Sequence, residues 1–377
     1  MAKLHGKKAR RNFLKGAGLA LGSAALLGAC GPAGHEGAGG GGEIQRRNLK
    51  MVTTWPKDFP GTGYAATRFA GRVRALSGGA IAIRVYAGGE LVPALSAFDA
   101  VSEGKADIYH GAEYYWQGRS PAFNFFASVP FGMTAGEAMA WIEFDGGQAL
   151  WDELSARYNI KPFMCGNSGT QMGGWFNREI RTLASLKGLR IRIPGLGGEV
   201  YARLGATPVT KAGAEIFLAL SQGNIDATEW IGPWNDMAFG LHTIAKYYYY
   251  PGIHEPGSIL GAGINLGLWN DFSETEKAIF ANAAVAENAV TWAEFNAENA
   301  RALHALLGQH KVELKRFPDE VLREMARVSD EVLKEAAAKD ELTGRVYESF
   351  MASRGRAAKW GEISERAFME ARALASQ

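Results

Sequence analysis

Residues 224–234, Asn-Ile-Asp-Ala-Thr-Glu-Trp-Ile-Gly-Pro-Trp, follow an apolar helical run that stops at Gly223. A glycine just past the last periodic residue is typical of a helix C-terminus. A short strand would then present Glu229 and Trp230 at its carboxyl end, before the Gly-Pro turn. Ligands of open α/β sheets bind beyond the carboxyl ends of strands. The stretch indicates either one wall of a small polar site or a buried strand whose tryptophans fill a core.

The same helix–glycine–strand unit occurs earlier in the chain. Residues 98–107 (FDAVSEGKAD) match residues 217–226 (FLALSQGNID) at Phe, Ala, Ser, Gly and Asp, with a constant offset of 119 residues. A chain of 377 residues is also too long for one core, because domains typically hold about 100–200 residues. We therefore predict two similar α/β lobes with a ligand held between them.

Strands and helices alternate along the chain, which indicates an α/β fold with a largely parallel sheet. The predicted strands are 49–53, 81–85, 107–108, 163–168, 187–194, 247–250, 259–268 and 312–317. The predicted helices are 62–76, 94–102, 216–220, 273–307 and most of 319–375. Ser273 and Glu276 form a capping box at the start of the long helix.

The order of these elements divides the chain into two lobes and a tail. We expect residues 48–162 with 269–318 in the first lobe and residues 163–268 in the second. The strands near 163 and 259 would carry the chain between the lobes. Residues 319–377 form a helical tail whose apolar side needs a partner, either the first lobe or a second subunit. This tail leads us to predict a homodimer.

The first 47 residues contain targeting signals. Arg10 and Arg11 begin a motif that resembles a twin-arginine export signal, and the apolar stretch 17–27 is shorter than the about 20 residues that span a bilayer. Residues 1–29 are therefore a predicted signal. Cys30 resembles the acylated cysteine of a bacterial lipoprotein, although a plain cleavable signal is the alternative. Residues 30–47 are a predicted flexible, Gly-rich tether.

Composition excludes several functional classes. The net charge of +2 argues against nucleic acid as a main partner. Seven His and two Cys include no pair at zinc-ligand spacing, which argues against a structural zinc site. Ten Trp and 48 Gly are high counts, and they suggest aromatic-lined sites and many tight turns.

Several motifs resemble one family of binding proteins. Residues 187–194 (KGLRIRIP) and 205–230 (GATPVTKAGAEIFLALSQGNIDATEW) are similar to solute-binding proteins of tripartite ATP-independent periplasmic (TRAP) transporters, the DctP-like family. The similarity spans about residues 48 to 330. Residues 166–176 (GNSGTQMGGWF) and 248–257 (YYYPGIHEPG) resemble the subgroup that binds 2-oxo acids, lactate and related small carboxylates.

The resemblance implies a fold, a location and a function. The expected fold is a two-lobed periplasmic-binding-protein fold, type II-like, with hinge strands, a long spanning helix and a helical C-terminal tail. The expected function is periplasmic capture of a small organic monocarboxylate for a membrane permease, with no catalysis. Residues 252–255 (Gly-Ile-His-Glu) differ from the aromatic-rich version of the motif, which leaves the size and polarity of the ligand's tail open.

The resemblance also assigns site residues. Gln171, Arg192, Glu229, Trp230 and Glu255 fall where the subgroup contacts its ligand and a cation. The expected ligand contacts are Gln171, Arg192, Trp230 and Tyr115, and the expected metal contacts are Glu229, Trp230 through its carbonyl, Glu255 and Gln171. Tyr115 and Trp234 are second-rank wall candidates whose alternative role is core packing.

Side-chain chemistry agrees with these roles. Arg presents a planar fork of donors that suits a carboxylate, so Arg192 is the expected anchor and Arg190, on the same face of the strand, ranks lower. Without the resemblance, a surface strand position would be the better interpretation of Arg192. Two glutamates suit an anion site only if Na⁺ or Ca²⁺ lies between them. Otherwise Glu229 and Glu255 are two unrelated exposed acids.

Two other functions would use the same residues. A periplasmic glycoside hydrolase would use Glu229 and Glu255 as its acid–base pair. The chain shows no Ser/His/Asp arrangement that would add support for a hydrolase. A ligand-sensing lobe that reports to a receptor would bind the same acids. The transporter function is favoured over both.

Overall fold

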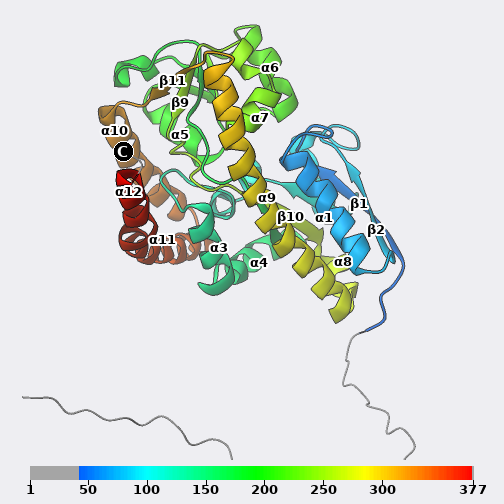
Figure 1. The fold of residues 1–377 in the computed structure, drawn as a ribbon. Helices are drawn as coiled ribbons and strands as arrows, with labels where there is room; N and C mark the ends of the chain where they lie inside the picture. Colours follow the sequence, from blue (N-terminus) through cyan, green and yellow to red (C-terminus); the bar gives the residue numbers. More distant parts are fainter. Residues whose placement is uncertain (1–41, 376–377) are drawn as a thin grey trace, which may run out of the picture. The chain divides into compact units, whose positions relative to one another are not determined.

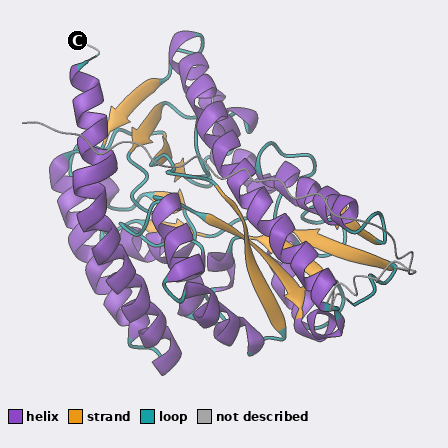
Figure 2. Ribbon diagram, turned by 60° about the horizontal axis from the view of Figure 1, so that its bottom comes forward, coloured by secondary structure: helices purple, strands orange, loops and turns teal. Residues whose placement is uncertain are grey.

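The computed structural model describes residues 42–375 and shows a mixed α/β fold with two β-sheets, whose strands lie among the helices (Figures 1 and 2). The predicted signal, Cys30 and the tether up to residue 41 lie outside the described residues. Within residues 42–375, no helix is both long enough and apolar enough to cross a membrane.

The first sheet has five strands in the order β2-β1-β3-β10-β4. Its strands are β1 (Arg47–Thr53), β2 (Ile81–Tyr86), β3 (Ile108–Gly111), β4 (Ile160–Asn167) and β10 (Ile259–Asn265). β1 runs parallel to β2 and β3, whereas β10 is antiparallel to β3 and β4. The helical elements of this part of the chain are α1 (Thr62–Leu76), η1 (Ala94–Ser96), α2 (Ala97–Ser102), η2 (Glu113–Trp116), η3 (Pro121–Phe126), α3 (Ala135–Phe144) and α4 (Gly147–Ala156). We call this part the five-stranded half.

The second sheet has six strands in the order β11-β9-β5-β8-β6-β7. Its strands are β5 (Gly174–Phe176), β6 (Arg190–Arg192), β7 (Thr207–Val209), β8 (Ala227–Thr228), β9 (Tyr247–Tyr250) and β11 (Glu313–Arg316). The helical elements between these strands are η4 (Leu183–Leu186), α5 (Gly195–Arg203), α6 (Gly213–Ser221), α7 (Pro233–Ala238) and η5 (Leu241–Thr243). We call this part the six-stranded half. The chain enters it after β4, leaves it before β10 and returns to it in β11, while the exact lobe boundaries stay a prediction.

The internal repeat is confirmed by matching hydrogen bonds in the two halves. Asp107 precedes β3, and its Oδ2 accepts the backbone N–H of Lys50 in β1 at 2.6 Å. Asp226 precedes β8, and its Oδ2 accepts the backbone N–H of Arg190 in β6 at 3.0 Å. In each half the backbone N–H of the aspartate also bonds back to the carbonyl of that same strand residue. The two helix–glycine–strand units therefore place β3 and β8 in the same way beside a parallel neighbour.

The long helix α9 (Glu274–Gly308) contacts both halves, since it packs on α1 and β4 and also on α7 (Figure 1). It follows α8 (Leu266–Asp271) and begins with the predicted capping box. The backbone N–H of Ser273 donates to Glu276 at 2.8 Å, and the Ser273 hydroxyl accepts the N–H of Glu276 at 3.3 Å. A helix that packs on elements of both halves gives them a common support.

The C-terminal helices pack mainly on the body of the protein. They are α10 (Asp319–Ala337), α11 (Glu341–Gly361), the π-helical segment η6 (Glu362–Arg366) and α12 (Ala367–Leu374). α10 packs on α5 and α11, and α11 packs on η3, α3 and α4. Val321, Met325 and Val346 are fully buried in the same core as residues of both halves. Within the helices α10 to α12, the first exposed large apolar side chain is that of Trp360.

A buried acid lies where β3 ends and η2 begins. Glu113 is fully buried, and the Tyr109 hydroxyl donates to its Oε1 at 2.6 Å. Gly261 of β10 leaves room for this carboxyl group, because a Cβ there would lie 2.5 Å from Oε1. Burial raises the pKa of Glu113 to about 8. The neutral acid thus fills the space between Tyr109 of β3 and Gly261 of β10.

Candidate functional site

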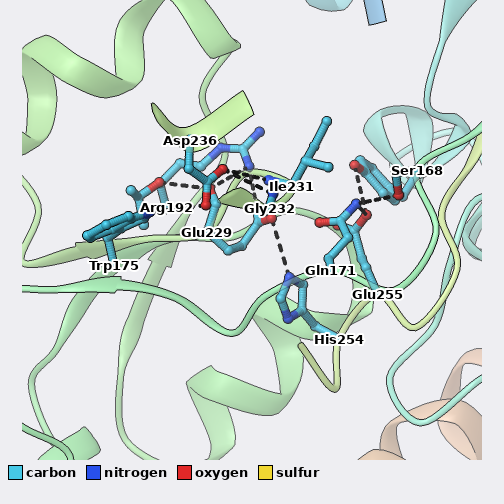
Figure 3. Close-up of polar contacts among 12 residues, drawn as sticks. Ser168, Gln171, Trp175, Arg192, Glu229, Ile231, Gly232, Asp236, His254 and Glu255 are labelled. Carbon is cyan, nitrogen blue, oxygen red and sulfur yellow. Dashed lines mark hydrogen bonds and ion pairs between the residues drawn. The ribbon is translucent and has the colours of Figure 1, made fainter. Parts of the chain in front are cut away.

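The loop after β8 is fixed by one buried carboxylate (Figure 3). Asp236, in the first turn of α7, accepts the backbone N–H groups of Ile231 and Gly232 at 3.2 Å each. Its other oxygen accepts the Trp175 indole N–H at 3.0 Å and the Tyr248 hydroxyl at 2.8 Å. Burial raises the pKa of Asp236 to about 7, although these donors favour its charged form. The loop that carries Glu229 and Trp230 is therefore held in a defined position.

Arg192 and Glu229 form a buried ion pair at the ends of two neighbouring strands. β6 and β8 are parallel, so both side chains lie at the same edge of the sheet. Arg192 Nη1 donates to Glu229 Oε1, and the two side chains are 1% and 0% exposed. The other donors of Arg192 reach the Lys211 carbonyl at 3.1 Å and the Tyr115 hydroxyl at 3.1 Å. Burial alone would lower the pKa of Arg192, but Glu229 raises it, so the guanidinium stays charged.

Gln171 and Glu255 come together from two loops between the sheets. Gln171 follows β4 and Glu255 precedes β10. Gln171 Nε2 donates to Glu255 Oε2 at 2.7 Å and to Ser168 Oγ at 3.0 Å, while the Tyr114 hydroxyl lies 3.4 Å from the same Glu255 oxygen. Burial, followed by the nearby charge of Glu229, raises the pKa of Glu255 to about 7. Among the described atoms, Gln171 Oε1 is buried and has no hydrogen-bond partner.

The structure adds His254 to the residues expected from the sequence. Its Nε2 lies 3.3 Å from Glu229 Oε2, and its side chain is 3% exposed. Donor atoms of Glu229, His254 and Glu255 all lie within 4.8 Å of one another. Burial alone would lower the pKa of His254. The hydrogen bond and the negative charge of Glu229 raise it, and the net shift is upward. Its place beside Glu255 was the only signal in the sequence, because no second histidine lies at metal-ligand spacing.

Trp230 forms an aromatic wall beside this cluster. The Arg192 guanidinium carbon lies 5.2 Å from the centre of the indole ring. Trp55 and Phe59, which follow β1, meet the same ring edge-to-face at 6.4 and 6.2 Å. Phe239 closes another side at 5.1 Å. Rings from both halves of the molecule therefore enclose Trp230.

The two second-rank candidates have different surroundings. Tyr115 lies in the cluster, because its hydroxyl accepts a hydrogen bond from Arg192. Trp234 instead packs on Phe295 of α9, with ring centres 5.5 Å apart, and its backbone N–H donates to Asn299. The structure thus brings together Gln171, Arg192, Glu229, Trp230, Glu255 and Tyr115, and leaves Trp234 against the long helix.

Comparison with known proteins identifies the family. The model of the bacterial extracellular solute-binding proteins, family 7, matches residues 51–340. The chain belongs to this family. A monocarboxylate 2-oxoacid-binding periplasmic protein from Nostoc is 39% identical to this solute-binding protein over 319 residues, which are 85% of this chain and 87% of the relative. Members of the family work outside the cytoplasm and bind solutes, which places this chain among periplasmic binding proteins.

Two solved structures of TRAP transporter solute-binding proteins are also similar. The protein from Bordetella bronchiseptica is a dimer with copurified calcium and picolinate bound. It is 33% identical to this chain with a TM-score of 0.86, and the match covers 88% of this chain and 100% of that one. The protein from Pseudoalteromonas atlantica holds sodium and pyruvate; it is 36% identical, has a TM-score of 0.84, and the match covers 86% and 99%. These matches confirm the predicted two-lobed fold.

A surface cavity of this solute-binding protein lies apart from the cluster. This cavity of about 460 Å³ lies at the carboxyl ends of β1 and β2, and its lining includes Lys57, Arg84 and Glu90. None of the six predicted site residues lines it. We place the candidate site at the Glu229–Glu255 cluster, because it combines buried charges with an unpartnered buried oxygen, Gln171 Oε1.

Proposed function

We propose that this solute-binding protein captures a small monocarboxylate together with a metal cation and delivers both to the permease of a TRAP transporter. The acid would be a 2-oxo acid such as pyruvate, or a lactate-like acid. The observation that carries the proposal is a pair of buried glutamates, Glu229 and Glu255, beside a single buried arginine. Such a site suits an anion only when a cation accompanies it.

The charges in the site can be counted. When Glu255 is ionised, Glu229, Glu255 and the incoming carboxylate bring three negative charges, and Arg192 brings one positive charge. His254 adds a second positive charge when it is protonated. The remainder is one or two negative charges in a buried space, where an uncompensated charge costs several kcal/mol. One Na⁺ or one Ca²⁺ would offset that remainder.

The residues present fit such an ion. Na⁺ and Ca²⁺ prefer oxygen ligands from carboxylates, amides and backbone carbonyls. Gln171 Oε1 is a buried acceptor without a partner, and its amide nitrogen already contacts Glu255. Glu229 Oε1 is taken by Arg192, while its Oε2 remains for an ion or for His254. We assign the ion to Glu229, Glu255, Gln171 and the Trp230 carbonyl.

The ligands of the relatives support an acid with a second donor atom. Pyruvate is bound by the Pseudoalteromonas protein and picolinate by the Bordetella protein. Both molecules carry a donor atom next to the carboxylate, a 2-oxo oxygen in one and a ring nitrogen in the other. Such an acid can chelate a cation through a five-membered ring. In this chain, Arg192 and Tyr115 would contact the carboxylate while the cation holds both donor atoms.

Calorimetry with controlled ions tests the proposal. Pyruvate and lactate are titrated into chelator-treated protein in a buffer whose only cation is bulky and organic, and then with Na⁺ or Ca²⁺ added. We expect binding to tighten with the inorganic ion, and the acid to tighten ion binding by the same factor, because linkage is reciprocal. Equal affinity in all buffers would contradict the ion assignment. Loss of binding to every acid would contradict the function.

The proposal includes export and pairing of subunits. Export through the twin-arginine signal and a lipid anchor on Cys30 are supported by the sequence motifs. A homodimer is supported by apolar side chains that stay exposed near the C-terminus and by the dimer of the Bordetella relative. These exposed side chains are Trp360, Ile363, Phe368, Met369 and Leu374. A second copy of the chain would cover them.

A further inference from the structure

We infer that His110, a buried residue of β3, is a positioning residue for solute binding: it fixes the ring of Trp55, and that ring braces Trp230 when the two halves are together. The inference rests on the proposed function, because it concerns access to the same site. It adds a residue that lies outside the candidate site and acts on it through another side chain.

The first observation is the hydrogen bond that holds Trp55. Its indole N–H donates to His110 Nδ1 at 2.7 Å, and the two residues are 2% and 0% exposed. Burial lowers the pKa of His110 to about 4, so the ring is neutral and one of its nitrogens can accept. An indole has one donor and no acceptor, so this bond satisfies the whole hydrogen-bonding capacity of the Trp55 ring.

The second observation is that His110 is itself held from its other side. Since Nδ1 accepts, Nε2 carries the proton, and it faces the carbonyl oxygen of Cys165 at 3.4 Å. Cys165 belongs to β4, the strand that leads into the loop of Gln171. The imidazole therefore has one defined tautomer and orientation, and it presents its acceptor to Trp55 in a fixed direction.

The third observation is where the Trp55 ring lies. It follows β1 in the five-stranded half, and it meets Trp230 of the six-stranded half edge-to-face with ring centres 6.4 Å apart. The other neighbour of Trp230 is the Arg192 guanidinium, whose carbon lies 5.2 Å from the ring centre. The bond to His110 is thus two side chains away from the expected carboxylate anchor.

The segment that begins at Trp55 makes further contacts across the two halves. The Phe59 ring lies 4.3 Å from the ring of Phe239. Asn235 Nδ2 donates to the carbonyl of Pro60 at 3.2 Å. Fixing the first residue of this segment therefore helps to fix a surface that the six-stranded half closes against.

These contacts must break and form again each time the site is filled. Arg192 and Glu229 are 1% and 0% exposed, so a solute reaches them only when the two halves move apart. With the halves apart, Trp55 loses its contact with Trp230, and its ring can turn the N–H to water. With the halves together it cannot, so a missing acceptor at His110 would leave a buried donor unpaired. Loss of the acceptor therefore disfavours the filled, closed site more than the open one.

Two substitutions separate the two nitrogens of His110. Asparagine places an acceptor close to the position of Nδ1, whereas glutamine places its amide near Nε2. We expect His110→Gln to weaken pyruvate binding at least roughly fivefold, mainly through faster dissociation, because the buried Trp55 donor is left unpaired. His110→Asn should bind pyruvate nearly as tightly as the unmodified protein. Calorimetry measures the affinity and stopped-flow mixing the dissociation rate, and His304→Gln, at an exposed position of α9, should change neither.

A double-mutant cycle shows whether His110 acts through Trp55. Trp55→Phe removes the indole N–H, so the addition of His110→Gln to that variant should weaken binding no further. In spectra of ¹⁵N-labelled protein recorded without acid, the Trp55 indole signal is the one that Trp55→Phe lacks. This signal should keep its position in His110→Asn and move in His110→Gln.

The unmodified protein gives a second measurement if His110→Gln does not fold. We expect a scalar coupling across the hydrogen bond between the indole nitrogen of Trp55 and the imidazole nitrogen of His110. We also expect the indole proton of Trp55 to exchange with water more slowly once pyruvate and the ion are bound. Absence of the coupling, or an exchange rate that pyruvate leaves unchanged, would show that His110 does not act in this way.

The outcomes separate the two proposals. An unchanged affinity and dissociation rate in His110→Gln, or equal losses in His110→Asn and His110→Gln, would overturn the inference and leave pyruvate binding by the unmodified protein intact. Failure of every acid to bind the unmodified protein would instead overturn the proposed function, and the indole spectra, which need no acid, would still decide whether His110 holds Trp55.

Discussion

Replacing Arg192 with methionine tests the centre of the site most directly. The change removes the charge and all donors while it keeps a long apolar side chain. Glu229, which is fully buried, would lose its ion-pair partner, and the Lys211 carbonyl and Tyr115 hydroxyl would lose theirs. Breaking a buried ion pair by removing one partner costs about 3–5 kcal/mol. We expect a loss of this size in the free energy of unfolding.

The same change should weaken acid binding. Truncating one member of a buried, hydrogen-bonded charge pair costs about 2–5 kcal/mol, which corresponds to roughly 30-fold or more in affinity. Urea denaturation measures the stability, and calorimetry with pyruvate and the preferred ion measures the affinity. Both are compared at the same pH and ion concentration.

Arg190 provides the matched control, because it lies two residues away on the same strand. Its side chain is 46% exposed and pairs with Asp226, which is 30% exposed. Exposed ion pairs contribute only about 0–1 kcal/mol, so Arg190→Met should change stability little and acid binding not at all. The double variant Arg192→Met/Glu229→Gln should regain part of the lost stability but no acid binding.

Two results would refute this reasoning. If Arg192→Met binds the acid as tightly as the unmodified protein while Arg190→Met does not, the wrong arginine has been assigned. If the double variant is no more stable than Arg192→Met alone, the stability of the site does not depend on the Arg192–Glu229 pair.

Three further predictions concern the fold and its assembly. Between about pH 4.5 and pH 8 only the unfolded chain has lost the proton of Glu113. The free energy of unfolding should therefore fall by on the order of 1.4 kcal/mol for each pH unit as the pH rises through this range. Denaturation of Glu113→Gln at several pH values should lack that part of the slope. Gly213→Ala would place a Cβ 2.7 Å from the Trp230 ring, and it should lower the free energy of unfolding by about 1–3 kcal/mol and weaken pyruvate binding. Gly71→Ala, which has open space around it, should stabilise α1. Unchanged pyruvate affinity in Gly213→Ala would show that the ring is free to move. A chain that ends at Lys359 should be monomeric by light scattering and bind pyruvate normally, and a monomeric mass for the full-length protein would contradict the predicted dimer.

Local patterns were sufficient to predict much of the fold. The apolar spacing of residues 62–76 predicted a helix with the bounds that α1 has, and the capping box predicted the start of α9. β5 was not predicted, because three residues carry no periodicity and this strand exists only through pairing with β8 and β9. Trp175 of β5 was not among the predicted site residues, although its indole N–H donates to Asp236.

The site required long-range information that the sequence does not contain. Arg190 and Arg192 share one face of a strand, and the spacing could not distinguish them. The structure does so, because Asp226 lies at the start of β8 near solvent and Glu229 lies at its buried end. His254 is 25 positions from Glu229 along the chain, and only the meeting of two loops brings them together.

The internal repeat has a consequence for how the protein acquires its solute. At the offset of the repeat, His110 in β3 stands where Glu229 follows β8, and Val52 in β1 pairs there as Arg192 does in β6. Burial lowers the pKa of His110 to about 4, so it is neutral, and it accepts the Trp55 indole N–H at 2.7 Å. At these matching positions the six-stranded half thus has a charged pair, Arg192 and Glu229, where the five-stranded half has Val52 and the neutral His110. A chimera that exchanges the six-stranded half between relatives should therefore carry over the charged contacts of the candidate site, while Tyr115 and the rings of Trp55 and Phe59 would still come from the five-stranded half.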